Sequence, residues 1–237
     1  MSSPQGSADR PLRVMSALVI VRTVEETVLP LLANEGLAVE MVWDPTVALM
    51  DRIARGETAD VIVAIDDPMD RLAAEGRLDP ASRRPVARAA FGLGVARGAP
   101  QPDIATAEAL KQSLLAARAV VWSRAGASGI YFERLIDRLG IGDAVRARGV
   151  VIPAGFTGEV VVRGDADIAI QQISELMSVD GIDLVGPMPP EVQEPTDFSA
   201  AAFVGPGVDA ARAARFIDVL TGPQAREALV RHGLEPR

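Results

Sequence analysis

The amino-acid sequence predicts an α/β protein made of mostly parallel β-sheets and divided into two lobes. Short apolar segments alternate with amphipathic ones along the chain, which favours strands connected by crossover helices. The length of 237 residues leaves room for two small lobes. The polar stretch Arg77–Pro85 and the proline-rich stretch Pro187–Asp197 are the best candidates for crossings between lobes. We therefore expect one lobe from residues 1–84 and 198–237 and another from residues 85–197, with a ligand cleft between them.

The first part of the chain has the pattern strand, helix, strand, helix, strand, which implies a parallel sheet. Apolar residues recur at helical spacing in Thr23–Glu35, whereas Ala59–Ile65 is apolar without alternation, as in a strand covered on both faces. The expected strands are Leu12–Ala17, Leu37–Trp43 and Ala59–Ile65, and the expected helices are Thr23–Glu35 and Val47–Ala54.

The remaining elements continue this alternation. A helix at Thr106–Leu115 is expected to begin with Thr106 as its cap. Further strands are expected at Val86–Ala96, Gly149–Ile152, Asp167–Gln171, Ile182–Val185 and Phe198–Val204, and further helices at Pro68–Glu75, Phe156–Val162, Ile173–Met177, Asp209–Leu220 and Pro223–His232.

The stretch Val120–Leu139 is the most informative local pattern. It predicts a buried strand, a loop of small and polar residues, and a helix with apolar residues at helical spacing. Unpaired N–H groups and the positive dipole end at such a helix start suit an anion. The alternative is that Ser128 serves only as the helix cap and Gly129 only as a turn residue.

Composition excludes several classes of function. The chain has no cysteine and one histidine, His232, which we expect on the surface, so thiolate sites and histidine-based metal sites are excluded. A net charge of -8 argues against nucleic-acid binding. We expect no cofactor, no metal and a monomer. The N-terminal segment lacks an apolar signal core, which predicts a cytoplasmic protein, or a periplasmic one if Met1 replaces a removed leader.

Several segments, in their order along the chain, resemble the periplasmic molybdate-binding protein family. They are LRVMSA, GETADVIVAIDDPMDRLAAEG, SGIYFERLIDRLGI, DLVGPMPPEVQ and LTGPQAREALVRHGLEP, and the resemblance extends from Leu12 to Pro236. It implies the type II periplasmic-binding-protein fold, in which each lobe is a mostly parallel sheet flanked by helices. It also implies an oxyanion held between the lobes by hydroxyls and backbone N–H groups, and membrane subunits of an ABC transporter as partners if the protein is exported.

Site residues follow from the same resemblance, position by position. The family's first serine position falls at Val19, with Ser16 and Ala17 nearby, and its second loop keeps a hydroxyl only at Thr46. The family's tyrosine position falls at Gln172. The full set of expected ligand-binding residues is Ser16, Ala17, Thr46, Ser123, Arg124, Ser128, Gly129, Phe156, Thr157 and Gln172.

Departures from the family pattern change the expected ligand. Two hydroxyl donors are lost, and the carboxylate of Asp44 would weaken binding of a doubly charged oxyanion. A larger ligand with carboxylate and hydroxyl groups fits better, because Arg124 can pair with a carboxylate. Each residue also has a structural alternative: Asp44 as a helix cap, Arg124 as a solvated loop residue, and Gln172 as a partner for backbone groups.

Two functions of different classes remain. The first, which we favour on sequence alone, is a binding protein that closes over a small oxyanion or carboxylate. The second is an isomerase of an unsaturated tricarboxylate such as aconitate, an activity that some relatives of this family have. In that case Asp44 or Glu175 is the expected base. The absence of an evident histidine or lysine base favours the first function, and the absence of an export signal favours the second.

Overall fold

The computed structural model describes residues 10–237 and divides the chain into two compact units. Unit 1 contains the chain up to Arg88 together with Asp197–Arg231 and Glu235–Arg237, and unit 2 contains Ala89–Thr196 and His232–Leu234. The first crossing therefore lies four residues later than expected, and the second lies one residue earlier. The return of three C-terminal residues to unit 2 was not expected.

The sheet of unit 1 is parallel at its centre and antiparallel at one side. Its strand order is β11-β4-β10-β3-β1-β2. β1 pairs in parallel with β2 and β3, whereas β10 is antiparallel to β3 and β11 is antiparallel to β4. The strands are β1 (Leu12–Ser16), β2 (Val39–Trp43), β3 (Val61–Ile65), β4 (Arg84–Ala89), β10 (Thr196–Ala202) and β11 (Glu235–Pro236). Because β1, β2 and β3 are parallel, their carboxyl ends share one edge of the sheet.

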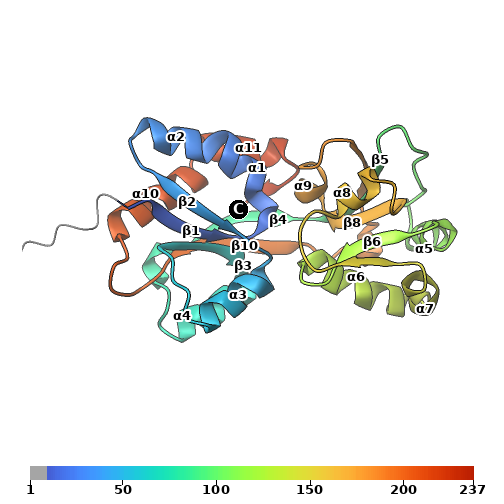
Figure 1. Cartoon of the computed structure of the whole chain (residues 1–237), viewed down its shortest axis with the longest axis horizontal. Helices are drawn as coiled ribbons and strands as arrows, with labels where there is room; N and C mark the ends of the chain where they lie inside the picture. The colour runs from blue at the N-terminus through green and yellow to red at the C-terminus, as the bar shows by residue number, and fades with distance from the viewer. Residues whose placement is uncertain (1–9) are drawn as a thin grey trace, which may run out of the picture. The chain divides into compact units, whose positions relative to one another are not determined.

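Helices cover both faces of this sheet (Figure 1), with α3 and α4 on one face and α1, α2 and α11 on the other. The helical segments are η1 (Leu18–Ile20), α1 (Val21–Thr23), η2 (Val24–Val28), α2 (Leu29–Asn34), α3 (Thr46–Ala54), α4 (Asp66–Ala74), η3 (Pro80–Ser82), α10 (Ala210–Thr221) and α11 (Pro223–Arg231). The helix expected at Thr23–Glu35 contains the π-helical turn η2. Pro30 has no N–H to donate to Glu26, which accounts for the local change in hydrogen bonding.

The sheet of unit 2 has the same design. Its strand order is β7-β6-β8-β5-β9, with β6 parallel to β7 and β8, and β5 antiparallel to β8 and β9. The strands are β5 (Phe91–Ala96), β6 (Val120–Ser123), β7 (Val150–Ile152), β8 (Ile168–Gln172) and β9 (Ile182–Pro187). The helices are α5 (Ala107–Ala116), α6 (Ala127–Arg138), α7 (Gly142–Arg146), α8 (Thr157–Val162), α9 (Ile173–Leu176) and η4 (Pro190–Val192).

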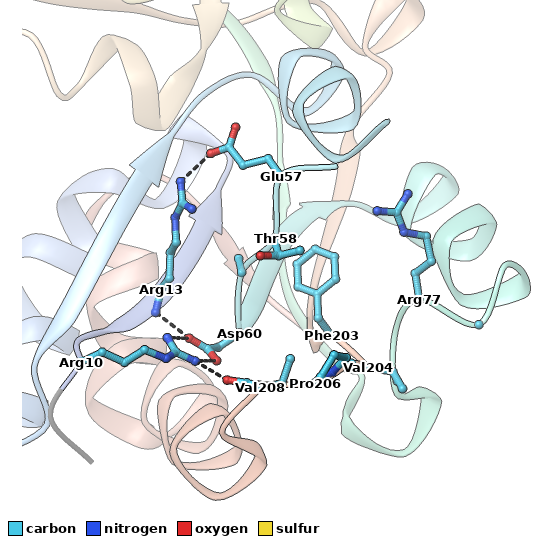
Figure 2. Close-up of a pocket in the computed structure, with 14 residues that line it drawn as sticks. Arg10, Arg13, Glu57, Thr58, Asp60, Arg77, Phe203, Val204, Pro206 and Val208 are labelled. Atoms are coloured by element: carbon cyan, nitrogen blue, oxygen red, sulfur yellow. Dashed lines mark hydrogen bonds and ion pairs between the residues drawn. The ribbon is translucent and has the colours of Figure 1, made fainter. Parts of the chain in front are cut away.

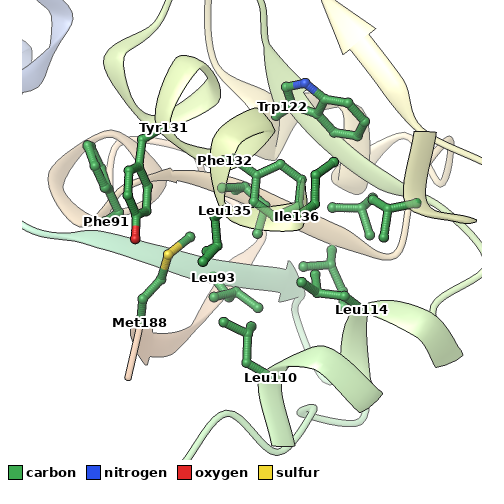
Figure 3. Packing of buried hydrophobic residues seen from close by; sticks show 14 of the residues in the cluster. Phe91, Leu93, Leu110, Leu114, Trp122, Tyr131, Phe132, Leu135, Ile136 and Met188 are labelled. Atoms are coloured by element: carbon green, nitrogen blue, oxygen red, sulfur yellow. The ribbon is translucent and has the colours of Figure 1, made fainter. Parts of the chain in front are cut away.

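Aromatic side chains fill the core between this sheet and α6 (Figure 3). The ring centroids of Trp122 and Phe132 lie 5.3 Å apart, and those of Phe91 and Tyr131 lie 5.1 Å apart. Trp122 is buried, and its indole Nε1 donates to a carboxylate oxygen of Glu133 at 2.8 Å. These contacts fix α6 against the ends of β5 and β6, so the loop between β6 and α6 starts from a rigid base.

Some expectations from the sequence were wrong. The single strand expected at Val86–Ala96 is two strands, β4 and β5, which belong to different sheets because the chain leaves unit 1 there. The cap of α6 is Gly126 rather than Ser128. His232 is buried, with 8% of its surface exposed. Of the helices in residues 10–237, none has both the length and the apolar character needed to span a bilayer.

Candidate functional site

In unit 1, the polar residues expected at the site lie at the carboxyl edge of the parallel strands. Ser16 ends β1 and its carbonyl accepts from the N–H of Asp44 at 3.2 Å, while its hydroxyl donates to the Ala17 carbonyl at 3.0 Å. Thr46 is the first residue of α3, and its Oγ1 accepts from the N–H of Ile65 at 3.4 Å. The hydroxyl hydrogen of Thr46 is therefore left to donate to a ligand at the start of a helix.

The Asp44 carboxylate at this edge is already neutralised. Its Oδ2 accepts from Nε of Arg52 at 2.7 Å, and Arg52 also pairs with Glu57 at 3.2 Å. Asp44 does not cap α3, whose cap is Pro45 without a side-chain hydrogen bond. An ion-paired carboxylate is a poor general base, so the pairing of Asp44 disfavours it for that role.

In unit 2, the loop between β6 and α6 is tightly built. The buried Ser123 hydroxyl accepts from the N–H of Gly126 at 3.0 Å. A Cβ on Gly129 would lie 1.7 Å from the Ser123 carbonyl oxygen, so only glycine fits where the helix passes over the strand. Arg124 is exposed, and its N–H donates to the carbonyl of Ile152 at 2.8 Å, which joins this loop to the end of β7.

Two side chains of unit 2 keep free hydrogen-bonding groups at the same edge. Ser128 lies in the first turn of α6 and is 2% exposed, and Gln172 ends β8 and is 3% exposed. Neither side chain forms a hydrogen bond with another group in the described part of the chain, residues 10–237. Nearly buried polar groups without protein partners are strong candidates for ligand contacts, since leaving them unpaired costs free energy.

The groups of Thr157 are used inside the protein instead. Its N–H and its hydroxyl both donate to Oε1 of Gln171 at 2.8 Å, and the hydroxyl also lies 3.3 Å from the Ile170 carbonyl oxygen. Thr157 is fully buried and begins α8, with the half-buried Phe156 as the helix cap. The expectation that Thr157 donates to a ligand therefore does not fit its geometry.

Glu175 is the most unusual ionisable residue at this edge. It lies in the first turn of α9, half-buried, and burial raises the pKa of its carboxyl from 4.5 to about 7. Hydrogen bonds from the Gln172 backbone and the Gln171 side chain oppose that shift but do not cancel it. A carboxyl that titrates near neutral pH can act as a proton acceptor and donor.

Sequence reasoning missed two residues of this region. Gln171 bonds Thr157 and the Gly155 carbonyl, the latter through Nε2 at 2.9 Å. The hydroxyl of Ser174 is buried without a hydrogen-bond partner among residues 10–237. The run of polar residues directly after a buried strand was the available signal. Within the described residues, no group of three acidic or histidine side chains could hold a metal ion.

The clearest cavity of unit 1 lies away from these residues (Figure 2). It has a volume of about 560 Å³ and lies at the amino ends of β1 and β3. Its buried Asp60 accepts from both terminal nitrogens of Arg10, at 2.6 and 2.8 Å, and from the N–H groups of Arg13 and Asp209. Asp60 is thus satisfied by protein groups and anchors the surrounding loops.

Comparison with known protein families decides the assignment of this fold. A family model described as bacterial extracellular solute-binding protein matches residues 12–235. The chain belongs to this family. A relative of similar sequence, an aconitate isomerase from a Pseudomonas species, is 33% identical over 231 residues, which cover 95% of this chain and 87% of that protein.

Solved structures show the same fold for this solute-binding protein. The periplasmic molybdate-binding protein of Azotobacter vinelandii has a TM-score of 0.76 at 19% identity, covering 94% of this chain and 98% of that one. A sulfate-binding protein from Mycobacterium tuberculosis has a TM-score of 0.72 at 16% identity, covering 95% and 86%. The expected type II solute-binding fold and the resemblance to molybdate-binding proteins are therefore confirmed.

Proposed function

We propose that this solute-binding protein is an isomerase of a small unsaturated tricarboxylate of the aconitate type, with Glu175 as its base. The observation that carries the proposal is the half-buried Glu175 carboxyl, whose pKa is raised to about 7 at the edge where Ser128 and Gln172 keep free hydrogen-bonding groups. Sequence reasoning favoured a binding protein because no base was evident. The environment of Glu175 removes that objection, and the 33% identical aconitate isomerase supports the same reaction.

The reaction needs only a proton shift across three carbons. The Glu175 carboxylate takes a proton from the methylene carbon of the substrate, and the electron pair moves into an allylic carbanion conjugated with the carboxylates. The same carboxyl then returns a proton to the former vinylic carbon, so the double bond changes position and no atom is gained or lost. Hydrogen-bond donors that face the substrate carboxylates stabilise the charge that develops in the transition state.

The donors at this edge suit that role. The N–H groups at the start of α6, the Ser128 hydroxyl and the Gln172 amide can each bond a carboxylate oxygen. Arg124 supplies a positive charge, since it is exposed and makes no ion pair with any of residues 10–237. In unit 1, Thr46 is the corresponding donor at the start of α3.

The test is conversion of trans-aconitate or cis-aconitate by the purified protein, followed by proton NMR in D₂O. A proton shift through a carboxyl that exchanges with solvent places deuterium on the substrate, and Glu175→Gln should abolish both conversion and deuterium uptake. Glu159→Gln, an exposed glutamate on α8, is the matched control and should keep wild-type activity. Absence of conversion by the wild type under all conditions tested contradicts the proposal.

A second candidate is a receptor for a small oxyanion or carboxylate, with no chemistry of its own. It is favoured by the two helix starts, at Thr46 and Ser128, that offer hydroxyls and N–H groups. Thermal-shift measurements with molybdate, sulfate, phosphate, citrate and the aconitates separate the two functions. Stabilisation by molybdate at micromolar concentration, without aconitate conversion, supports the receptor.

Location and partners follow from the same choice. Membership of an extracellular solute-binding family supports the periplasm as the location. If the protein is a receptor there, membrane subunits of an ABC transporter are its proposed partners. Monomeric state remains a prediction.

A further inference from the structure

The cavity at the amino ends of β1 and β3 is a preformed compartment of unit 1 that the proposed reaction does not use (Figure 2). One of its walls is the loop after β10, which Arg10 holds by donating to the Gly207 carbonyl at 2.5 Å. Another wall is the segment before β3, where Glu57 pairs with Arg13 at 2.5 Å and with Arg52 at 3.2 Å. Because these walls are fixed by protein contacts, a ligand that enters the cavity pays little to order them.

The size and the apolar lining of this cavity suit a small organic molecule. Its volume of about 560 Å³ lies within the range of small-molecule sites, which are mostly apolar with a few polar groups that orient the ligand. Phe203 forms a buried part of the lining, with 8% of its surface exposed, whereas Val204 beside it is 58% exposed. An apolar body placed against these two side chains would remove apolar surface from water.

Arg77 supplies the charge that is left unbalanced in the cavity. The carboxylates of Asp60 and Glu57 are each paired with an arginine, but Arg77 makes no ion pair with any of residues 10–237. Its Nη2 donates to the Ile53 carbonyl at 3.1 Å, which orients the guanidinium and leaves its other N–H groups free. Figure 2 shows this guanidinium pointing inward, on the opposite side of the cavity from Arg13. A fixed guanidinium of this kind matches the geometry of a carboxylate.

We propose that this cavity binds a small monocarboxylate with an apolar body, with its carboxylate on Arg77 and its body against Phe203 and Val204. An inorganic oxyanion would leave the apolar wall without a contact, and an uncharged apolar molecule would leave Arg77 unpaired. A tricarboxylate would bring further negative charges close to Glu57, whose arginine partners are already engaged.

The site is separate from the one proposed for the isomerase. It lies at the amino ends of β1 and β3, whereas Thr46 lies at the opposite edge of the same sheet, where its hydroxyl accepts from the N–H of Ile65 at the end of β3. Parallel pairing of β1 and β3 keeps these two edges apart.

The experiment is a titration of ¹⁵N-labelled protein with benzoate, benzamide and acetate, followed by proton–nitrogen correlation spectra. Benzoate should produce saturable shifts in the backbone signals of Arg77, Val204, Gly205 and Val208. Benzamide has the same ring without the charge, and acetate has the charge without the ring. Each should bind at least about fivefold more weakly than benzoate, because each lacks one of the two contacts.

Two substitutions, each with a matched control on α11, test the two contacts. Arg77→Gln should weaken benzoate binding by about tenfold, since hydrogen bonds from a charged group are lost, whereas Arg231→Gln, at an exposed arginine, should not change it. Val204→Ser should weaken binding by about threefold, and Val230→Ser, at a valine that is 61% exposed, should leave it unchanged. Val204 is exposed, so its substitution tests the site even where Arg77→Gln unfolds the protein.

Three results would overturn the inference. The first is no saturable shift of the Val204 and Gly205 signals in the wild type. The second is benzoate-induced shifts confined to Ser128, at the proposed isomerase site, or to Leu72, in a smaller cavity that Arg77 also lines. The third is an equal loss of affinity in each variant and its control. Conversion of aconitate does not enter this experiment, so its outcome is independent of the proposed isomerase function.

Discussion

Replacement of Glu175 by glutamine should stabilise the protein above neutral pH while removing its proposed base. Burial raises the pKa of Glu175 from 4.5 to about 7, so the folded protein keeps a proton that the unfolded chain releases between these values. Stability therefore falls as pH rises through this window. A pKa difference of about 2.5, at about 1.4 kcal/mol for each pH unit, corresponds to about 3.5 kcal/mol of folding free energy. Because the side chain is only half-buried, we expect a gain of about 2 to 3 kcal/mol for Glu175→Gln above pH 8.

Urea unfolding of wild type and Glu175→Gln at pH 4.5, 6, 7 and 8.5 measures this effect. The two proteins should have nearly equal free energies of unfolding at pH 4.5, and the difference should grow with pH until about pH 8. Glu159→Gln, which alters an exposed glutamate, should show no such trend. A difference between wild type and Glu175→Gln that does not change with pH refutes the reasoning, and with it the account of Glu175 as a base poised near neutral pH.

Three other substitutions test the scaffold by urea unfolding. Gly129→Ala should lower the free energy of unfolding by about 3 kcal/mol or more, because the new Cβ would lie 1.7 Å from the Ser123 carbonyl oxygen. A variant as stable as the wild type would contradict this close approach. Thr106→Ala should lower the free energy of unfolding by about 1 kcal/mol, since the Thr106 hydroxyl accepts from the N–H of Ala109 at 3.1 Å at the start of α5. A loss below about 0.3 kcal/mol, the level of an ordinary surface substitution, argues against the cap. Asp60→Asn should lower the free energy of unfolding by about 2 to 3 kcal/mol at pH 7. Burial raises the pKa of Asp60, but hydrogen bonds from Arg10, Arg13 and Asp209 lower it further, so the pKa lies below its usual range and the difference should shrink below pH 4. A loss of stability that is constant with pH contradicts this account.

Most of the fold was predictable because burial and helix starts have local sequence signatures. β3 was recognised from an apolar run, and the cap of α5 from Thr106. The sequence predicts one strand where the structure has β4 and β5, because no turn residue separates them at Ala90. Which sheet each half joins depends on pairing with β10 and β8, and those partners are distant in sequence.

The sequence predicts which strand ends carry the candidate site, but not which of its side chains are free to bind a ligand. Gln172 ends β8, and Ser128 and Glu175 lie just after β6 and β8, whose carboxyl ends share an edge because the two strands are parallel. Which side chains remain free depends on partners that spacing does not reveal. Asp44, for example, pairs with Arg52, eight residues later on α3, and this pairing depends on the orientation of a long side chain.

The environment of Glu175 links the stability of unit 2 to its proposed chemistry. A carboxylate in water is too weak a base for a carbon acid, and removal of water from it raises its proton affinity at the expense of folding free energy. The polar groups of Gln171 and Gln172 limit that rise, which keeps the pKa of the carboxyl near 7. A solute-binding fold needs only donors to hold an anion. One partly buried glutamate just after the end of β8 is the addition that would turn such a site into an isomerase.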